Sequence, residues 1–392
     1  MRFEGAAPEV MIRGLDRIRA ELGIPTGFPP DVVAAAEKAA ARPIGSAHVD
    51  RTGRRFLTLD PASSIDLDQA FDVEVAGDDI VLHYAIADVG WFVRPGDPLD
   101  VEAFERGVTV YLPDQRSTLY PTVLSEGAAS LLPDVDRPAV VFTVRVDPAG
   151  HPHLDGAERA IIRSRAKLAY GTVVPGDLPD GFAELYRRIT AAEVERGAPR
   201  VEFPEQEIEQ HGDGSFALTF RPRAEAEEQN ASMSLATNMA VGAALYAAGT
   251  GLFRVMPDVD DRRHRRLRHS AKAFGLDWAD GVSLDAFERS LPRDDPRTSA
   301  FLMAVRRAAG GASYAPFDAD ERPWHSAVAA TYAQATAPLR RLQDRYVVEA
   351  ALAVADGTPV GDDIAAAFDV LPAAMAAADN RANRAERQAL EL

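Results

Sequence analysis

Strand-like runs crowd into the segment from residue 56 to about residue 146, and they constrain the fold more than any other feature of the sequence. The runs are rich in β-branched and aromatic residues, which favour extended backbone on a buried or half-buried surface. The quartets AGDD and DPAG supply turn chemistry between two pairs of them. The runs are FLTLD, AFDVEVA, DIVLHYAIADV and AVVFTVRV. This pattern predicts a β-sheet in this part of the chain.

Helical periodicity flanks the sheet segment on both sides. Residues 1 to about 45 contain two such stretches, and the helix-breaking sequence GIPTGFPP separates them. From about Leu178 the pattern is mainly helical, and small residues at close spacing suit tightly packed helices. We therefore expect one large α/β (α+β) domain with a short helical N-terminal extension.

The chain of 392 residues contains no cysteine, which excludes a disulfide-linked partner, zinc ribbons and thiol catalysis, and fits a reducing compartment. The N-terminus lacks the apolar core of a secretory signal, and no apolar run is long enough to span a bilayer. We therefore expect a cytoplasmic protein without a membrane partner.

The net charge of −17 argues against a protein that coats nucleic acid, because binding to phosphate draws on basic surface. A basic channel inside an acidic shell is compatible with this charge. The cluster DRRHRRLRH at residues 261–269 shows that positive charge is unevenly distributed, and a solvated helix face explains the cluster equally well.

Asp60, Asp66 and Asp68 crowd into one short stretch directly after a strand-like run. Asp66 and Asp68 share a face if the segment is extended, and a loop that folds back brings Asp60 to the same point. Several carboxylates without histidine or cysteine nearby suit Mg²⁺ or Mn²⁺ rather than Zn²⁺. Such sites typically support the attack of water on a phosphodiester. An acidic surface loop with Asx turns is the alternative, and it is the commoner explanation of an isolated pair of aspartates.

Seven blocks along the chain carry a resemblance to a known family. They are TLDPASSIDLDQAF, HYAIADVGWFVRPGDPLDVEAFERGVTVYLPD, LSEGAASLLPDVDRPAVVF, RSRAKLAYGTV, RGAPRVEFPEQEIE, YAQATAPLRRLQDR and NRANRAERQAL. In this order they resemble the signature segments of the RNB (ribonuclease II-like) family, processive 3′→5′ exoribonucleases that act on single-stranded RNA. The likeness implies a mixed β-sheet core surrounded by helices, with an internal RNA channel. It also implies two parts, a helical N-terminal extension at residues 1–48 and an RNB-like catalytic domain at residues 49–392.

The resemblance implies roles for individual residues of the site. Asp60, Asp66 and Asp68 would hold the metal and position the attacking water, with Asp68 as a catalytic residue. Arg340 corresponds to the catalytic arginine that contacts phosphate near the cleaved bond, where a guanidinium neutralises charge in the transition state. Tyr111 corresponds to the aromatic residue that stacks on the 3′-terminal base, and its alternative is a half-buried strand tyrosine.

Further implied contacts lie outside this group. Arg341 and Arg345 would be structural or general phosphate contacts, and Glu386 corresponds to a glutamate near the nucleotide end of the RNA channel. A solvated glutamate in an arginine-rich helix is the alternative for Glu386. Asp88 in the IAD tripeptide is expected to be a structural acid.

The sequence departs from the family pattern in two places. Gln69 stands where a fourth acid is often found, so we expect Gln69 to be a weak, uncharged ligand and the site to bind its metal less tightly. The acidic pattern expected before the helix at EEQNASMSLATN is also altered, and Glu227, Glu228 or Asn230 would take its place.

The flanking OB-type domains of well-known relatives have no counterpart in these residues. OB domains supply much of the electrostatic attraction for single-stranded RNA, so we expect this chain to bind RNA more weakly and less processively. Whether a separate RNA-binding partner replaces them is left open.

These observations predict a metal-dependent 3′→5′ exoribonuclease that hydrolyses single-stranded RNA to nucleoside 5′-monophosphates, with Mg²⁺ or Mn²⁺ as cofactor. The alternative is a catalytically weak or inactive RNB-fold protein with an RNA-binding or regulatory role. The joint presence of the three aspartates, Tyr111 and Arg340 favours the enzyme, because a non-catalytic copy would be free to lose them.

Overall fold

A computed structural model describes residues 3–4, 8–198, 205–210, 216–221, 224–292, 295–308 and 310–392. The predicted block at residues 196–209 therefore lies partly outside the described residues. The strands are β1 (Phe3–Glu4), β2 (Val49–Asp50), β3 (Thr58–Asp60), β4 (Gln69–Ala76), β5 (Asp79–Ala87), β6 (Val110–Tyr111), β7 (Arg116–Ser117), β8 (Asp136–Val146), β9 (Pro152–Arg163), β10 (Lys167–Ala169), β11 (Glu205–Gln210), β12 (Phe216–Arg221), β13 (Leu252–Val255) and β14 (Ser313–Pro316). The α-helices are α1 (Pro8–Leu22), α2 (Pro30–Ala40), α3 (Val89–Phe92), α4 (Pro98–Arg106), α5 (Phe182–Glu195), α6 (Glu225–Ala247), α7 (Asp261–Ala273), α8 (Leu284–Ser290), α9 (Pro296–Ala308), α10 (Leu342–Ala355) and α11 (Asp362–Leu390).

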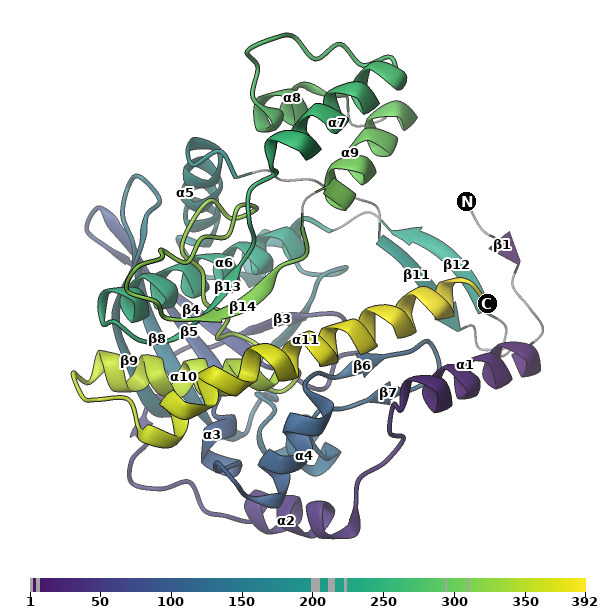
Figure 1. The fold of residues 1–392 in the computed structure, drawn as a ribbon. Coiled ribbons are helices and arrows are strands. Elements are labelled where there is room, and N and C mark those ends of the chain that lie inside the picture. The colour runs from purple at the N-terminus through teal and green to yellow at the C-terminus, as the bar shows by residue number, and fades with distance from the viewer. Residues whose placement is uncertain are drawn as a thin grey trace.

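A five-stranded mixed sheet forms the centre of the molecule, in the order β2-β9-β8-β5-β4 (Figure 1). Strand β2 runs parallel to β9, and the other neighbours are antiparallel. The register places Tyr84 opposite Phe71 on one side and Phe142 on the other, and all three side chains are fully buried. Helices α6 and α10 pack against β9, and α5 packs against β8, so the apolar runs of the strands are covered. The expected mixed sheet surrounded by helices is confirmed.

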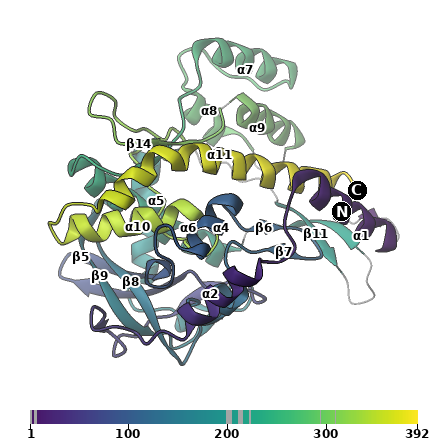
Figure 2. The ribbon, with the colours of Figure 1, turned by 60° about the horizontal axis from the view of Figure 1, so that its bottom comes forward.

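Helices α1 and α2 share the hydrophobic core of the sheet. Leu15 of α1 and Ala36 of α2 are completely buried in that core. Helix α2 packs on α4, and α1 lies beside the far end of α11 (Figure 2). The predicted N-terminal helices are therefore present, whereas the domain boundary at residue 48 stays a prediction.

Helices α7, α8 and α9 form a small group apart from the sheet, at the top of Figure 1. We call this group the three-helix module. It has its own hydrophobic core, in which Trp278 stacks on Phe287 with ring centres 4.9 Å apart. At its base, β13 and β14 pair antiparallel, with Val255 opposite Ser313. The sequence analysis predicted no separate unit here, because its helices have the same local signals as those of the main domain.

The basic cluster at residues 261–269 lies on α7 of the three-helix module. Leu267 faces the module core, whereas Arg262, Arg263, Arg265 and Arg266 are exposed. The cluster is therefore a solvated helix face, which was the alternative considered from the sequence.

Helix α11 spans 29 residues and contacts α10, β14 and α1 along its length. It carries many charged residues, and Pro372 lies inside it. Within the described part of the chain, neither α11 nor any other helix has both the length and the apolar surface needed to cross a membrane.

Candidate active site

The three aspartates lie where β3 ends and β4 begins. Asp60 is the last residue of β3, and Asp68 directly precedes β4. The loop between them is fixed by Ser130, whose hydroxyl accepts a hydrogen bond from the Leu67 N–H at 2.9 Å. Besides burial, the charge of Asp66 contributes to the raised pKa of the Asp60 carboxyl.

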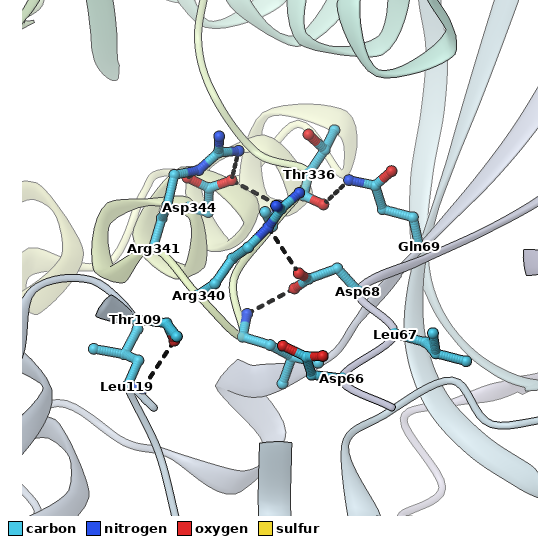
Figure 3. Close-up of polar contacts among 12 residues, drawn as sticks. Asp66, Leu67, Asp68, Gln69, Thr109, Leu119, Thr336, Arg340, Arg341 and Asp344 are labelled. Carbon is cyan, nitrogen blue, oxygen red and sulfur yellow. Dashed lines mark hydrogen bonds and ion pairs between the residues drawn. The ribbon is translucent and has the colours of Figure 1, made fainter. Parts of the chain in front are cut away.

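Asp68 is 5% exposed and holds a distant segment of the chain. Its Oδ1 accepts a hydrogen bond from the Leu339 N–H at 2.7 Å, and its Oδ2 lies 3.3 Å from Arg340 Nε (Figure 3). Burial raises the pKa of Asp68 to about 7, although the charge of Arg340 opposes this shift. The Arg340 side chain itself is about half exposed, at 47%.

Asp60 has a buried carboxylate oxygen, Oδ2, to which the described residues offer no hydrogen bond. Burial raises the pKa of Asp60 to about 6, opposed by the charges of Arg340 and Lys167. An orphaned acceptor of this kind is costly, because it has lost water and gained no donor. The charge of Arg340 opposes the raised pKa of both Asp60 and Asp68, and the ion pair of Arg340 at 3.3 Å is with Asp68.

Asp66 pairs with the β6–β7 ribbon. Arg116 of β7 donates to its Oδ1 at 2.8 Å and to Glu126 at 3.1 Å. The Tyr111 hydroxyl lies 3.5 Å from Asp66 Oδ2, and 49% of the Tyr111 residue is exposed. Tyr111 is thus a half-exposed residue next to Asp66, and its stacking role stays a prediction. Arg116 was missed at the sequence level, because nothing in the local pattern shows which acid it would meet.

Residues 332–341 form the loop that carries Arg340, here called the arginine loop. Buried side chains satisfy three of its backbone N–H groups. The pairs are Ala335 with Asn238, Ala337 with Asp344, and Leu339 with Asp68, at 2.7–2.8 Å. Gly242 allows the arginine loop to pack closely against α6, since a Cβ at this position would lie only 2.9 Å from Ala333 N. The fold therefore holds the backbone around Arg340 before any substrate binds.

Gln69 also contacts the arginine loop. Its Nε2 donates to the Thr336 carbonyl at 2.6 Å, and its Oε1 accepts from the hydroxyls of Tyr84 and Ser234. Figure 3 shows the Gln69 side chain directed to Thr336, whereas Asp68 points to Arg340. The weak metal contact expected for Gln69 stays a prediction, and the amide already has three protein partners.

The other predicted RNA contacts lie in different surroundings. Arg341 donates to Asp344 at 2.9 and 2.6 Å, and its side chain is 25% exposed. Arg345 is buried and contacts Asp100. Glu386 lies on the exposed side of α11, near the end of that helix. The RNA contacts of Arg341 and Glu386 stay predictions.

Tyr170 is a polar residue of the site that the sequence analysis did not assign, and its partner Asn230 is one of the three residues considered for the altered acidic pattern. The Tyr170 N–H donates to the Asp60 carbonyl at 3.2 Å, just beyond the strand pair of β3 and β10. Asn230 of α6 donates to the Tyr170 hydroxyl at 3.0 Å. Of the acids considered for this place, Glu228 accepts from Tyr186 at 3.4 Å.

The segment between α1 and α2, residues 23–29, docks on the β6–β7 ribbon. The Ser117 hydroxyl donates to the Pro25 carbonyl at 2.6 Å, and Arg106 donates to the carbonyl of Gly27. Arg19 of α1 pairs with Asp114, in the turn of the ribbon. The N-terminal helices therefore support the ribbon that carries Tyr111.

The arrangement of acidic and other ligand side chains bears on metal binding. In the part of the chain that the structure describes, no group of three or more His, Cys, Asp or Glu side chains is arranged to hold a metal ion. Among the predicted metal-binding aspartates, Asp60 has a buried carboxylate oxygen without a hydrogen-bond partner among the described residues.

Known proteins resemble this chain in sequence and in structure. The RNB domain family model matches residues 49–354. Ribonuclease R of Aquifex aeolicus is 27% identical over 372 residues, which cover 87% of this chain and 51% of that protein. Ribonuclease R of Escherichia coli is 29% identical over 328 residues, covering 76% of this chain and 39% of that protein. The chain thus spans about half the length, or less, of these curated relatives.

Solved structures share the fold. RNase R of Mycoplasma genitalium, in complex with ribose-methylated single-stranded RNA, matches with a TM-score of 0.85 at 19% identity, covering 97% of this chain and 64% of that chain. Yeast Ssd1, described as a pseudonuclease, matches with a TM-score of 0.74 at 17% identity, covering 97% and 50%. Because the family model covers most of the chain and the fold agrees, this chain belongs to the RNB family.

Proposed function

We propose that the chain is a metal-dependent 3′→5′ exoribonuclease that hydrolyses single-stranded RNA to nucleoside 5′-monophosphates in the cytoplasm. The observation that carries the proposal is the orphaned, buried oxygen of Asp60 in a site that also holds Asp68 and a half-exposed Arg340. The family assignment and the relatives named Ribonuclease R support it from outside the site.

Mg²⁺ or Mn²⁺ fits the donors of this site. Carboxylate oxygens are the hard ligands that these ions prefer, and a cation would favour the charged forms of Asp60 and Asp68, whose pKa values burial raises to about 6 and about 7. Mg²⁺ commonly uses one or two carboxylates together with water and substrate phosphate, so a three-residue cluster is not required. When bound, the ion supplies positive charge that favours attack of water on a phosphodiester.

The other residues bind and orient the substrate. The arginine loop fixes the backbone next to Arg340, and the half-exposed Arg340 guanidinium can neutralise phosphate charge. Tyr111 is half exposed, so the terminal base can stack on its ring, and stacking accepts every base. Arg341 and Glu386 are proposed as weaker RNA contacts.

A second candidate function is an RNB-fold protein that binds RNA and cleaves it weakly or not at all. Two observations favour it: Gln69 replaces an acid, and Asp66 and Asp68 are already paired with Arg116 and Arg340. The fold is also that of Ssd1, a protein described as a pseudonuclease.

Incubation of the purified protein with single-stranded RNA separates the two functions. With Mg²⁺, RNA labelled at the 5′ end should shorten progressively, and RNA labelled at the 3′ end should release labelled nucleoside 5′-monophosphate at once. EDTA or Asp68→Asn should stop the reaction, whereas Asp136→Asn, which changes an exposed ion pair, should not. RNA binding without cleavage by the wild type would favour the second function, and cleavage in EDTA would contradict a metal-dependent site.

A further inference from the structure

The side chain of Gln69 connects three separate segments of the fold. Its Nε2 donates to the carbonyl of Thr336, a residue 267 positions away in the arginine loop. Its Oε1 accepts from the Tyr84 hydroxyl on β5 and from the Ser234 hydroxyl on α6, the latter at 3.1 Å. The two hydroxyls also lie 2.8 Å from each other. Gln69 therefore links the sheet, α6 and the arginine loop.

A primary amide supplies this set of contacts without taking up a proton. It offers N–H donors at one end and a carbonyl acceptor at the other, whereas an ionised carboxylate only accepts. A carboxylate at position 69 would face the Thr336 carbonyl without a proton between the two oxygens. Tyr84 is completely buried, which fixes the position of the hydroxyl that donates a hydrogen bond to Gln69 Oε1. These contacts explain why glutamine rather than an acid suits this position.

The contact with Thr336 completes the set of contacts that hold the arginine loop. Three loop N–H groups already bond to buried side chains, and Gln69 binds the Thr336 carbonyl on the same segment. Next along the chain, the Ala337 carbonyl accepts from the Arg340 N–H at 3.2 Å. A shift of Thr336 would therefore move the turn from which the Arg340 side chain projects.

We infer that Gln69 is a positioning residue for Arg340 and is not a metal ligand. The inference rests on the proposed function for its effect on catalysis, but the geometry of the arginine loop is measurable without any activity. Gln69 acts by fixing the Thr336 carbonyl, with Tyr84 and Ser234 holding the amide in the orientation that this requires.

Three variants and one control test the inference. Gln69→Glu keeps the shape and removes the donor, Gln69→Leu removes every polar contact, and Tyr84→Phe removes one buried hydroxyl beside the amide. Tyr346→Phe is the matched control, since Tyr346 is also buried and its hydroxyl bonds to Asp100 at 2.8 Å, outside the network of Gln69.

Kinetics, Mg²⁺ titration and hydrogen exchange give independent readouts. We expect kcat to fall about 10–100-fold in both Gln69 variants and less in Tyr84→Phe, with KM for RNA nearly unchanged, because small misplacements of a catalytic group have effects of this size. The shift in melting temperature produced by MgCl₂ alone should be the same in Gln69→Leu and the wild type. Amide exchange in residues 332–341 should rise in the Gln69 variants and not in Tyr346→Phe.

A metal ligand would give the opposite pattern. A Gln69→Glu protein that binds Mg²⁺ several-fold more tightly, or a Gln69→Leu protein that loses the MgCl₂ shift, would overturn the inference. Unchanged exchange in residues 332–341 of Gln69→Leu would overturn it as well. If the wild type does not cleave RNA, the proposed function fails, and the exchange and MgCl₂ measurements still decide the role of Gln69.

Discussion

Replacing Asp88 with asparagine removes one charge from a buried ion network, and we expect this change to destabilise the protein strongly. Asp88 is 1% exposed, contacts Arg159 and lies 2.9 Å from His48 Nε2. Removing one partner of a buried ion pair costs about 3–5 kcal/mol. Asparagine can still accept the hydrogen bond from Trp91 N–H at the start of α3, and Arg159 keeps Glu349, 2.5 Å away. We therefore expect a loss near the lower end, about 3 kcal/mol.

The same strand supplies a matched control. Arg163, also on β9, pairs with Asp136 at 2.7 Å, but both side chains are more than two-fifths exposed. Exposed pairs contribute about 0–1 kcal/mol because water and salt screen them, so Asp136→Asn should cost less than about 1 kcal/mol. Urea unfolding at pH 7, followed by tryptophan fluorescence, measures both losses.

The pH dependence of this prediction has a defined sign. Burial alone raises the pKa of Asp88, but the hydrogen bond with His48 and the charge of Arg159 outweigh it, so the folded pKa is lowered. The stabilisation is therefore fully present above the unfolded pKa of about 4 and is lost as the pH falls through the folded value. Equal losses for the two variants at pH 7, or a wild-type advantage over Asp88→Asn that is unchanged well below pH 4, would refute the reasoning.

The remaining predictions concern the site and the segments that support it. Tyr111→Ala should remove one stacking contact, worth about 1–3 kcal/mol per base, and change the length of the limit product, whereas Tyr111→Phe should not; an unchanged product ladder and affinity would contradict a stacking role. Asp68→Ala should be less stable in urea than Asp68→Asn by about 1–3 kcal/mol, because alanine orphans the buried Leu339 N–H; equal stability would show that this hydrogen bond contributes nothing. Arg19→Met should remove the ion pair with Asp114 and speed amide exchange in residues 110–117, and exchange at the wild-type rate would argue against support from α1.

Local patterns were enough to predict three of the five strands of the central sheet, β4, β5 and β8, and the position of the acidic loop, whereas β2 and β9 were not predicted. The runs that became β4, β5 and β8 have strand propensity along their whole length, and Asp60 does end a strand. Helices α1 and α2 were also visible, because amphipathic periodicity is a property of neighbouring residues. Their burial in the core of the sheet was not visible, since it depends on what they pack against.

The chemistry of single residues was harder to predict. Gln69 is predicted to be a weak ligand because it stands where the family pattern often has a fourth acid, and that role stays a prediction. Its contacts in the fold come from β5, α6 and the arginine loop. Arg116 reaches Asp66 across 50 residues, and no periodicity records such a contact. Sequence patterns therefore indicate which residue types gather at a site, whereas long-range packing decides which way each side chain points.

The strand pair at the base of the three-helix module makes this module a suitable segment to delete from the chain. Val255 and Ser313 face each other across a strand pair, and neighbouring strands lie about 4.8 Å apart. A tight turn can span that gap, so residues 256–312 could be replaced by a few residues without stretching either strand. The module keeps its apolar side chains in a core of its own, so the excision would leave the core of the sheet filled. Any property that disappears with the excised segment could then be assigned to the module by subtraction.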